Sequence, residues 1–426
     1  MSETRLPPID EQRLWRRVET LASFTTPEVP WTRRAFSPLF RQARAWLRQE
    51  FADAGLAVVQ DAAGNLIGRR PGLEDGRAPI ATGSHCDTVV GGGRFDGIIG
   101  VLAGLEVAQA LRDAGHALRH PFEVIDFLSE EPTDHGISCV GSRGMVGLLD
   151  HDMLAAIDPG GASLAQALTA IGGDPSALSR PLRNPGDLTA FVELHIEQGP
   201  VLESHRLPIG VVTGIVGIRR VMIRVAGRAD HAGTTPMDIR CDALVGAARI
   251  ISEVRRLACI LGDGPDYVVA TIGRLSVVPN APNAVPAVVE MTLEVRSDRT
   301  EVLERFPEDL MGAVRADLDA LRVSASVGQL SRSRPTECSA PVMAAIQRAA
   351  DGLGYRTMTL PSGAGHDSTY VAMLAPVGMI FVPCLDGRSH CPEEWIEPSQ
   401  LSAGARVLYQ TICELDRDPP ARSARI

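Results

Sequence analysis

Apolar runs alternate with amphipathic segments along the first part of the chain, to about residue 212. A helix is expected over 99–111, and the expected strands are 79–83, 122–128, 190–194 and, near the other end of the chain, 377–382. Strands that alternate with helices are typical of an α/β unit with a mostly parallel sheet. We therefore predict an α/β fold with a largely parallel central sheet.

The pattern of apolar positions changes between residues 213 and 330. The strands expected here are 221–225, 267–274, 288–296 and 323–327, and the expected helices are 242–257 and 301–321. This βαββαβ order is typical of a small sandwich with two helices on one face of a sheet. We predict that 213–330 form a smaller inserted domain, and that 1–212 and 331–426 together form the larger, discontinuous one. Residues 413–426 are polar and rich in proline and arginine, so we expect a frayed tail there.

The chain has 426 residues and no lysine, so all 42 basic residues are arginine. This excludes Schiff-base chemistry, P-loops, Ser-Lys amidases, Cys-Glu-Lys hydrolases and metal sites bridged by a carboxylated lysine. The 52 acidic residues give a formal charge of -10, which argues against a nucleic-acid partner. An anionic small molecule would need locally placed arginines.

The N-terminal sequence, Met1 to Thr4, does not begin a basic stretch followed by an apolar core, and no apolar run reaches 18 residues. We expect a cytoplasmic protein that does not bind membranes. The eight cysteines include no Cys-x-x-Cys pair, which is typical of reduced thiols. Cys86 and Cys391 adjoin histidines, and a nucleophilic role for either is a weaker alternative.

Polar residues follow the ends of four expected strands: His85 and Asp87, Glu130 and Glu131, His195, and His390. In open α/β sheets this edge is where sites are built. The two glutamates and the three histidines together suit two borderline divalent ions such as zinc. Taken singly, each motif also fits a solvated carboxylate or a structural histidine. The glycines at 91–93 could instead cradle a phosphate, although no Gly-Lys-Ser/Thr follows them.

Five motifs in this order resemble the hydantoinase/carbamoylase amidases: 83–88, 92–97, 195–199, 231–237 and 362–367. These enzymes form a branch of the dinuclear metallopeptidase and aminoacylase superfamily, and the resemblance spans roughly residues 15 to 410. The branch includes allantoate amidohydrolase, ureidoglycolate amidohydrolase, β-ureidopropionase and N-carbamoyl-L-amino acid hydrolase. The resemblance implies hydrolysis of a ureido C–N bond, with release of ammonia and carbon dioxide.

The resemblance also implies a role for each site residue. Asp96 would bridge two divalent metal ions, and the other ligands would be His85, Glu131, His195 and His390. Asp87 would orient His85, and Glu130 would be the general base. Zinc or manganese is the expected metal, and cobalt or nickel is also compatible with these ligands.

Further residues are implied to contact the substrate. His231, on the inserted domain, resembles a histidine that stabilises the transition state. In relatives this histidine reaches the active site of the partner subunit in a homodimer. The substrate's carboxylate or ureido oxygens would be held by Arg219, Asn283 and Arg296. The remaining pocket positions would be Gln198, Gly363, Gly365 and His366. We therefore expect a homodimer built through the inserted domain, with Arg219 and Arg296 gripping the carboxylate.

The sequence departs from the commonest family pattern at Pro132-Thr133, where many members have Gly-Ser. This form resembles the allantoate and ureidoglycolate amidohydrolases, and so do the residues around 365–368, 380–384 and 389–394. Allantoate or ureidoglycolate is therefore the first expected substrate. N-carbamoyl-L-amino acids are the alternative. Two other readings are an aminoacylase or exopeptidase, which would release no ammonia, and a non-catalytic metal-stabilised scaffold or sensor, which would lack a ligand or the base.

Overall fold

The computed structural model describes residues 7–421 as two compact units. The larger unit comprises the residues up to 213, 338–360 and 365 onward, and the smaller comprises 214–337 and 361–364. The smaller unit extends beyond the expected residue 330, because its last long strand stays paired until Arg332. Residues 1–6 and 422–426, which include the N-terminal residues considered above and the end of the expected tail, lie outside the described residues.

A nine-stranded sheet forms the centre of the larger unit and continues into the segments that lead to the smaller one. Its main path is β1 (Ala57–Gln60), β2 (Leu66–Arg70), β4 (Phe122–Phe127), β3 (Ile80–His85), β5 (Ala190–Ile196), β13 (Val377–Val382), β6 (Ile209–Ile215) and β11 (Thr336–Glu337), and β12 (Thr357–Ser362) pairs with β6. The four central strands, β4, β3, β5 and β13, are mutually parallel, and antiparallel strands flank them. The prediction of a largely parallel central sheet is confirmed.

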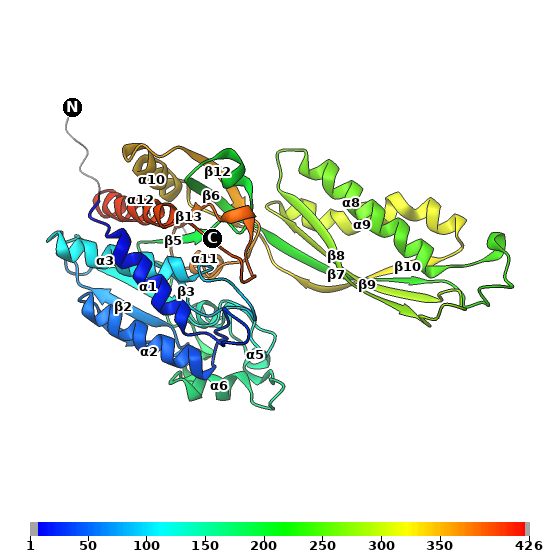
Figure 1. Ribbon diagram of the computed structural model, residues 1–426, viewed down its shortest axis with the longest axis horizontal. Coiled ribbons are helices and arrows are strands. Elements are labelled where there is room, and N and C mark those ends of the chain that lie inside the picture. The colour runs from blue at the N-terminus through cyan, green and yellow to red at the C-terminus, as the bar shows by residue number, and fades with distance from the viewer. Residues whose placement is uncertain (1–6, 422–426) are drawn as a thin grey trace. The chain divides into compact units, whose positions relative to one another are not determined.

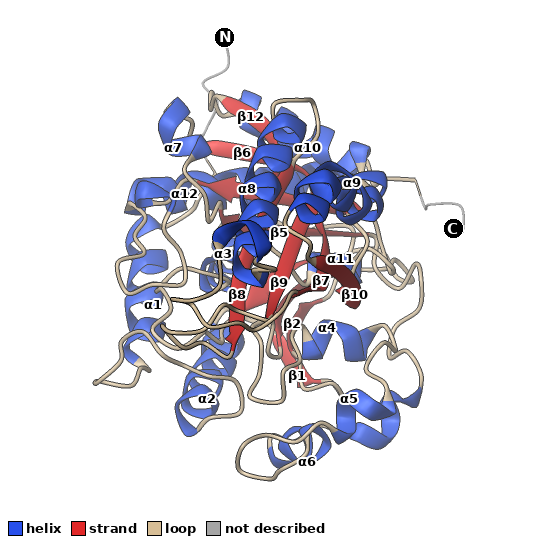
Figure 2. Cartoon of the chain, turned by 90° about the vertical axis from the view of Figure 1, so that its right-hand side faces the viewer, coloured by secondary structure: helices blue, strands red, loops and turns tan. Residues whose placement is uncertain are grey.

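Helices lie on both sides of this sheet (Figure 2). One face packs against α1 (Glu11–Ser23), α2 (Pro38–Asp53), α3 (Ile98–Asp113), α10 (Ala340–Gly352) and α12 (Pro398–Arg417), and the other against α4 (Val140–Met145) and α11 (Ser368–Val371). Shorter helices are α5 (His151–Ala155), α6 (Leu164–Ala170) and α7 (Val201–His205), with 3₁₀ turns at Pro175–Ser179, Met237–Ile239 and Leu385–Gly387. Because strand side chains alternate, Val192 and Leu194 of β5 enter one core and Phe191 the other.

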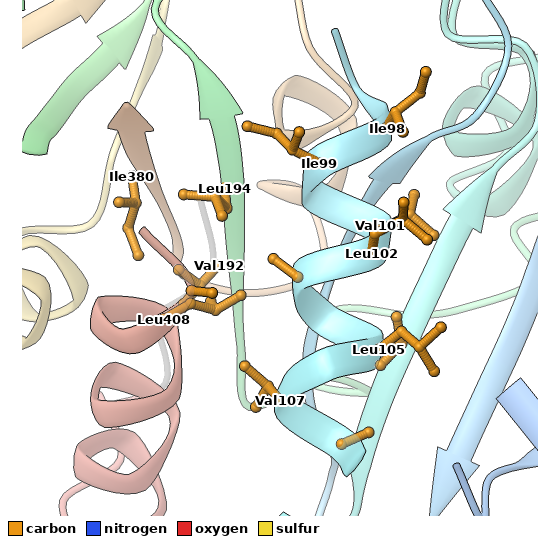
Figure 3. Close-up of a cluster of buried hydrophobic side chains, with 14 of the residues drawn as sticks. Ile98, Ile99, Val101, Leu102, Leu105, Val107, Val192, Leu194, Ile380 and Leu408 are labelled. Atoms are coloured by element: carbon orange, nitrogen blue, oxygen red, sulfur yellow. The ribbon is translucent and has the colours of Figure 1, made fainter. Parts of the chain in front are cut away.

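Helix α3 is the most deeply buried helix of this layer, with every residue from Ile98 to Leu111 buried. Its apolar residues belong to one buried cluster with Val192 and Leu194 of β5, Ile380 of β13 and Leu408 of α12 (Figure 3). A helix that is apolar on all sides needs such enclosure. The packing fixes the start of α3, and therefore the loop before it, against the carboxyl end of the sheet.

The expectation of a frayed tail from residue 413 is wrong for residues 413–417. Helix α12 continues to Arg417, with Cys413 and Leu415 buried. The carboxylate of Asp416 accepts the backbone N–H groups of Arg119 at 3.0 Å and His120 at 2.8 Å. Among residues 7–421, no helix is both long and apolar enough to cross a membrane.

The smaller unit is a four-stranded antiparallel sheet with two helices on one face (Figure 1). In chain order its elements are β7 (Gly217–Ala226), α8 (Ala243–Gly262), β8 (Val268–Val278), β9 (Val288–Ser297), α9 (Thr300–Ala320) and β10 (Ser324–Arg332). The sheet order is β10-β7-β9-β8. Alternate residues of β7, such as Val221 and Ile223, pack under the helices. The predicted βαββαβ sandwich is therefore present.

Candidate metal centre

The predicted ligands of the larger unit meet at the carboxyl edge of its parallel strands. His85 ends β3, His195 lies near the end of β5, and Glu131 follows β4. His390 lies in the loop after β13, and Asp96 lies just before α3. Residues more than 300 positions apart in the chain thus meet, because parallel strands end at one edge.

Two groups of possible ligands share one carboxylate. The ligand atoms of each group lie within 4.8 Å of one another, and the groups are His85, Asp96 and His195, and Asp96, Glu131 and His390. Oδ1 of Asp96 is 3.2 Å from Nε2 of His195, whereas Oδ2 is 2.8 Å from Nε2 of His390. His390 Nε2 is also 3.2 Å from Oε1 of Glu131. A carboxylate whose oxygens face different ligand groups can bridge two cations.

The ring orientations of His85 and His195 fit metal ligation. Nδ1 of His85 donates to the carbonyl of Asp87 at 3.1 Å, and Nδ1 of His195 donates to that of Ile196 at 2.9 Å. These bonds leave Nε2 as the lone-pair atom of each neutral ring. The backbone N–H of Gly97 donates to Nε2 of His195 at 3.2 Å, which requires that lone pair.

The charges of the cluster also fit a cation. Burial opposes the charged imidazolium, but carboxylates, first that of Glu130, raise the pKa of His85 to about 10. Hydrogen bonds to Asp96 and Glu131 raise the pKa of His390 to about 11. Burial likewise opposes the charge of Asp96, yet the bond from His390 holds its pKa below the ordinary value. The carboxylates thus stabilise positive charge among them, which divalent cations would supply.

Glu130 lies beside this cluster, with Oε2 3.6 Å from Nε2 of His85 and only 12% of its side chain exposed. Burial raises its pKa well above the ordinary value. The carboxylate of Asp87 accepts the backbone N–H groups of Glu130 at 3.3 Å and Glu131 at 3.2 Å, and lies 3.7 Å from Nδ1 of His85. Asp87 thus contacts the backbone of both glutamates through its carboxylate, and the ring of His85 through its backbone carbonyl.

Gln198 and His366, both predicted pocket residues, also lie at this cluster. The amide of Gln198 donates to both oxygens of Asp96 at 3.0 Å. The ring of His366 meets that of His195 edge to face, with 4.5 Å between centroids, and burial lowers its pKa. A carbon at the Cβ position of Gly365 would contact nothing within 4 Å. The backbone there does not require glycine for space.

Two residues of the site were given no role by the sequence. The buried carboxylate of Glu394 accepts the backbone N–H groups of Phe95 and Asp96, and the hydroxyl of Ser389 contacts Glu394 and Asp96. Their position beside His390 is the signal that could have drawn attention to them. The thiol of Cys139 is also close, 3.6 Å from Oε1 of Glu130.

The thiol of Cys86 is unsuited to nucleophilic attack. It is buried, it faces Oδ2 of Asp126 at 3.4 Å, and burial raises its pKa well above the ordinary value. Reactive thiols require a lowered pKa and access to solvent. This alternative is therefore not supported for Cys86.

The smaller unit carries His231 and Asn283 side by side. The two segments are joined by a bridge between His231 and Ala284 and by a bond from the N–H of Ala232 to the carbonyl of Asn283 at 3.0 Å. Both His231 and Asn283 are exposed. His231 and Asn283 thus lie on adjacent segments of the smaller unit.

Arg219 and Arg296 do not converge as expected. Arg219 is opposite Val295, whose face is covered by helices, and donates to the carbonyls of Leu303 and Glu304 in α9. Arg296, one position further along β9, faces the other side and donates to the carbonyl of Gly363 at 2.7 Å. Because strand side chains alternate, the joint grip predicted for these arginines does not occur within one chain.

The fold and the ligand set define the class of a metal-dependent hydrolase. Residues 81–414 match peptidase family M20/M25/M40, and the chain belongs to this family. The N-carbamoyl-L-amino acid amidohydrolase of Geobacillus stearothermophilus is 41% identical over 96% of this chain and 99% of the relative. Its counterpart from Paenarthrobacter aurescens is 40% identical over 95% of this chain and 98% of the relative. A solved amidase of the hydantoinase/carbamoylase family from Burkholderia multivorans has a TM-score of 0.90 and 36% identity, covering 97% and 100%.

Other relatives carry different substrate names. A ureidoglycolate hydrolase of Oryza sativa is 35% identical over 96% of this chain and 85% of the relative. The allantoate amidohydrolase of Bacillus subtilis is 32% identical over 90% and 92%. The chain is thus a hydrolase that acts on non-peptide amide bonds.

Proposed function

We propose that the chain hydrolyses the ureido C–N bond of a ureido-substituted carboxylic acid and releases ammonia and carbon dioxide. The observation that carries this proposal is the carboxylate of Asp96, shared by two ligand groups, with Glu130 beside one of them. The names of the relatives support the ureido class. A ureido carbonyl is a poor electrophile, so it requires both an activated water and polarisation.

Each residue of the cluster has a chemical role in this proposal. One cation would be held by His85, Asp96 and His195, and a second by Asp96, Glu131 and His390. Such ions, when bound, would supply a water of lowered pKa and would polarise the carbonyl. Glu130 takes the proton of the attacking water at Oε2 and delivers it to the departing nitrogen. The resulting carbamate decomposes to ammonia and carbon dioxide.

We place the remaining substrate contacts on the smaller unit. His231 would donate a hydrogen bond to the developing negative charge, and Asn283 would contact the same group. Arg296 would hold the carboxylate. We further propose a homodimer through this unit, with His231 reaching the partner's site. Within the described residues β8 has an unpaired edge, and its Leu275 and Val278 are exposed.

Two substrate kinds fit the proposal. Pro132-Thr133 favours allantoate or ureidoglycolate, as expected from the sequence. Thr133, however, accepts the N–H groups of His135 and Ile137 with its hydroxyl, so it also shapes its own loop. The higher identity to N-carbamoyl-L-amino acid amidohydrolases favours the second kind.

Ammonia release by enzyme reconstituted with zinc or manganese tests the function. The panel comprises allantoate, ureidoglycolate, N-carbamoyl-L- and D-amino acids, N-carbamoyl-β-alanine and N-acyl amino acids. Ammonia from a ureido substrate is expected, and Glu130→Ala is the matched blank. Turnover of N-acyl amino acids alone, without ammonia, would replace the proposal with an aminoacylase.

We propose a cytoplasmic location, which cell fractionation tests.

A further inference from the structure

Glu394 lies between the loops that carry Asp96 and His390. Its side chain is fully buried. Oε1 accepts the backbone N–H of Phe95 at 2.8 Å and that of Asp96 at 3.1 Å. Oε2 accepts from the hydroxyl of Ser389, the residue before His390, at 2.9 Å. One carboxylate thus connects the backbone of the shared ligand with the loop of a second ligand.

Gly93 leaves the space that this carboxylate occupies. A carbon at its Cβ position would lie 1.8 Å from Oε1 of Glu394. The residues that follow Gly93 and Glu394 are also in contact. The guanidinium of Arg94 lies 4.6 Å from the ring of Trp395, and it lies 4.8 Å from the ring of Trp31. The two loops are therefore joined at a buried polar contact and at an aromatic one beside it.

We propose that Glu394 is a positioning residue that fixes Asp96 relative to His390, and thereby sets the affinity for the cation that these two residues share with Glu131. The inference rests on the metal centre proposed above. Without Glu394, two buried N–H groups lose their acceptor and the loop before α3 is released. Residues that hold metal ligands in place contribute about 10- to 100-fold to metal affinity.

Zinc titration of the metal-free protein, followed by calorimetry, tests this role without activity as the readout. Wild type is expected to bind two ions. Glu394→Ala and Gly93→Ala are each expected to weaken the second ion about 10- to 100-fold. Glu394→Gln retains an oxygen for the two N–H groups and is expected to keep most of the affinity. Glu393→Ala is the control, because Glu393 is 60% exposed and pairs with Arg388.

The outcomes separate this inference from the function proposed above. If wild type binds fewer than two zinc ions, the dinuclear centre fails, and the inference with it. If wild type binds two and Glu394→Ala and Gly93→Ala bind both equally tightly, only the positioning role is overturned. If Glu394→Gln binds the second zinc ion as weakly as Glu394→Ala does, the positioning role is also overturned, and the negative charge of Glu394 would account for the affinity instead. Should circular dichroism show Glu394→Ala unfolded, Gly93→Ala decides alone. The double variant should be no weaker than the worse single one, because both changes displace one carboxylate.

Discussion

The guanidinium groups of Arg219 and Arg296 point to opposite faces of the four-stranded sheet, although their strands are neighbours. The strand register pairs Arg219 with Val295 and Arg296 with Ile218. The two arginines therefore stand at neighbouring rather than paired positions, and their side chains leave the sheet on opposite faces. Arg219 is held by the carbonyls of Leu303 and Glu304. The two side chains therefore have separable roles.

Replacement of these arginines should affect different quantities. Arg296→Ala is expected to raise KM for the ureido acid about 10- to 100-fold, because charge-assisted bonds to the carboxylate are lost. Arg219→Ala is expected to lower the free energy of unfolding by about 1–3 kcal/mol and to leave KM unchanged. Steady-state kinetics and denaturant unfolding measure these effects. Arg224→Ala is the control, since Arg224 is 50% exposed, shares the face of Arg296 and pairs with Glu290, which Arg296 does not contact. An increase in KM for Arg219→Ala instead would contradict this assignment.

Glu130→Gln should separate proton transfer from metal binding. The variant is expected to fold, to keep its metal and to lose about 10²- to 10⁴-fold in kcat, the usual contribution of a general base. Ammonia release and metal analysis measure both properties. Glu131→Gln is the matched comparison and should lose metal. Near wild-type turnover of the Glu130 variant would exclude it as the base.

Metal affinity should rise with pH. In the metal-free protein the carboxylates raise the pKa of His85 to about 10 and that of His390 to about 11, so both rings carry two protons at neutral pH. A ligating ring must be neutral, so each binding event releases a proton. Between about pH 6 and about pH 8, apparent affinity should rise up to about tenfold per pH unit for each proton released. Titration in buffers of different ionisation enthalpy counts the protons, and a pH-independent affinity would contradict the expectation.

Gly97→Ala should remove metal binding through His85. Gly97 has φ of +69°, and a Cβ there would lie 2.2 Å from Nε2 of His85. The expected result is loss of metal together with about 1–2 kcal/mol of backbone strain. Gly115→Ala is the matched control, because Gly115 has φ of +63° and open space around its Cβ position. That variant should show the strain and keep the metal. Full metal content in Gly97→Ala would show that the ring can move without loss.

Mixing two inactive variants tests the proposed sharing of sites between subunits. If His231 acts across the dimer, half of the dimers formed from Glu130→Ala and His231→Ala chains contain one intact site, and about a quarter of wild-type activity should return. If His231 acts within its own chain, no intact site forms. Native mass spectrometry confirms subunit exchange, and ammonia release reports recovery.

Much of the fold could be predicted from the sequence, because buried parallel strands are short apolar runs and their ends carry polar residues. The same rule brought His85, His195 and Glu131 to one edge. The sequence predicts a tail from residue 413, whereas helix α12 continues to Arg417. Proline and arginine after residue 417 obscure the apolar positions of Cys413 and Leu415.

Other parts of the site depend on register and space, which composition does not reveal. The opposite directions of Arg219 and Arg296 follow from the pairing of β7 with β9. Glu394 is buried because Gly93, about 300 residues earlier, lacks a side chain. Neither pairing has a local sequence signal.

The pairing of β5 with β13 has a consequence for synthesis of the chain. Val377 pairs with Phe191, and the nearly contiguous smaller unit lies between them in the sequence. On the ribosome, the smaller unit is therefore complete before the last central strand of the larger sheet has been made. Until β13 arrives, one side of β5 lacks its partner strand, and nascent chains are exposed to aggregation at that edge during this interval.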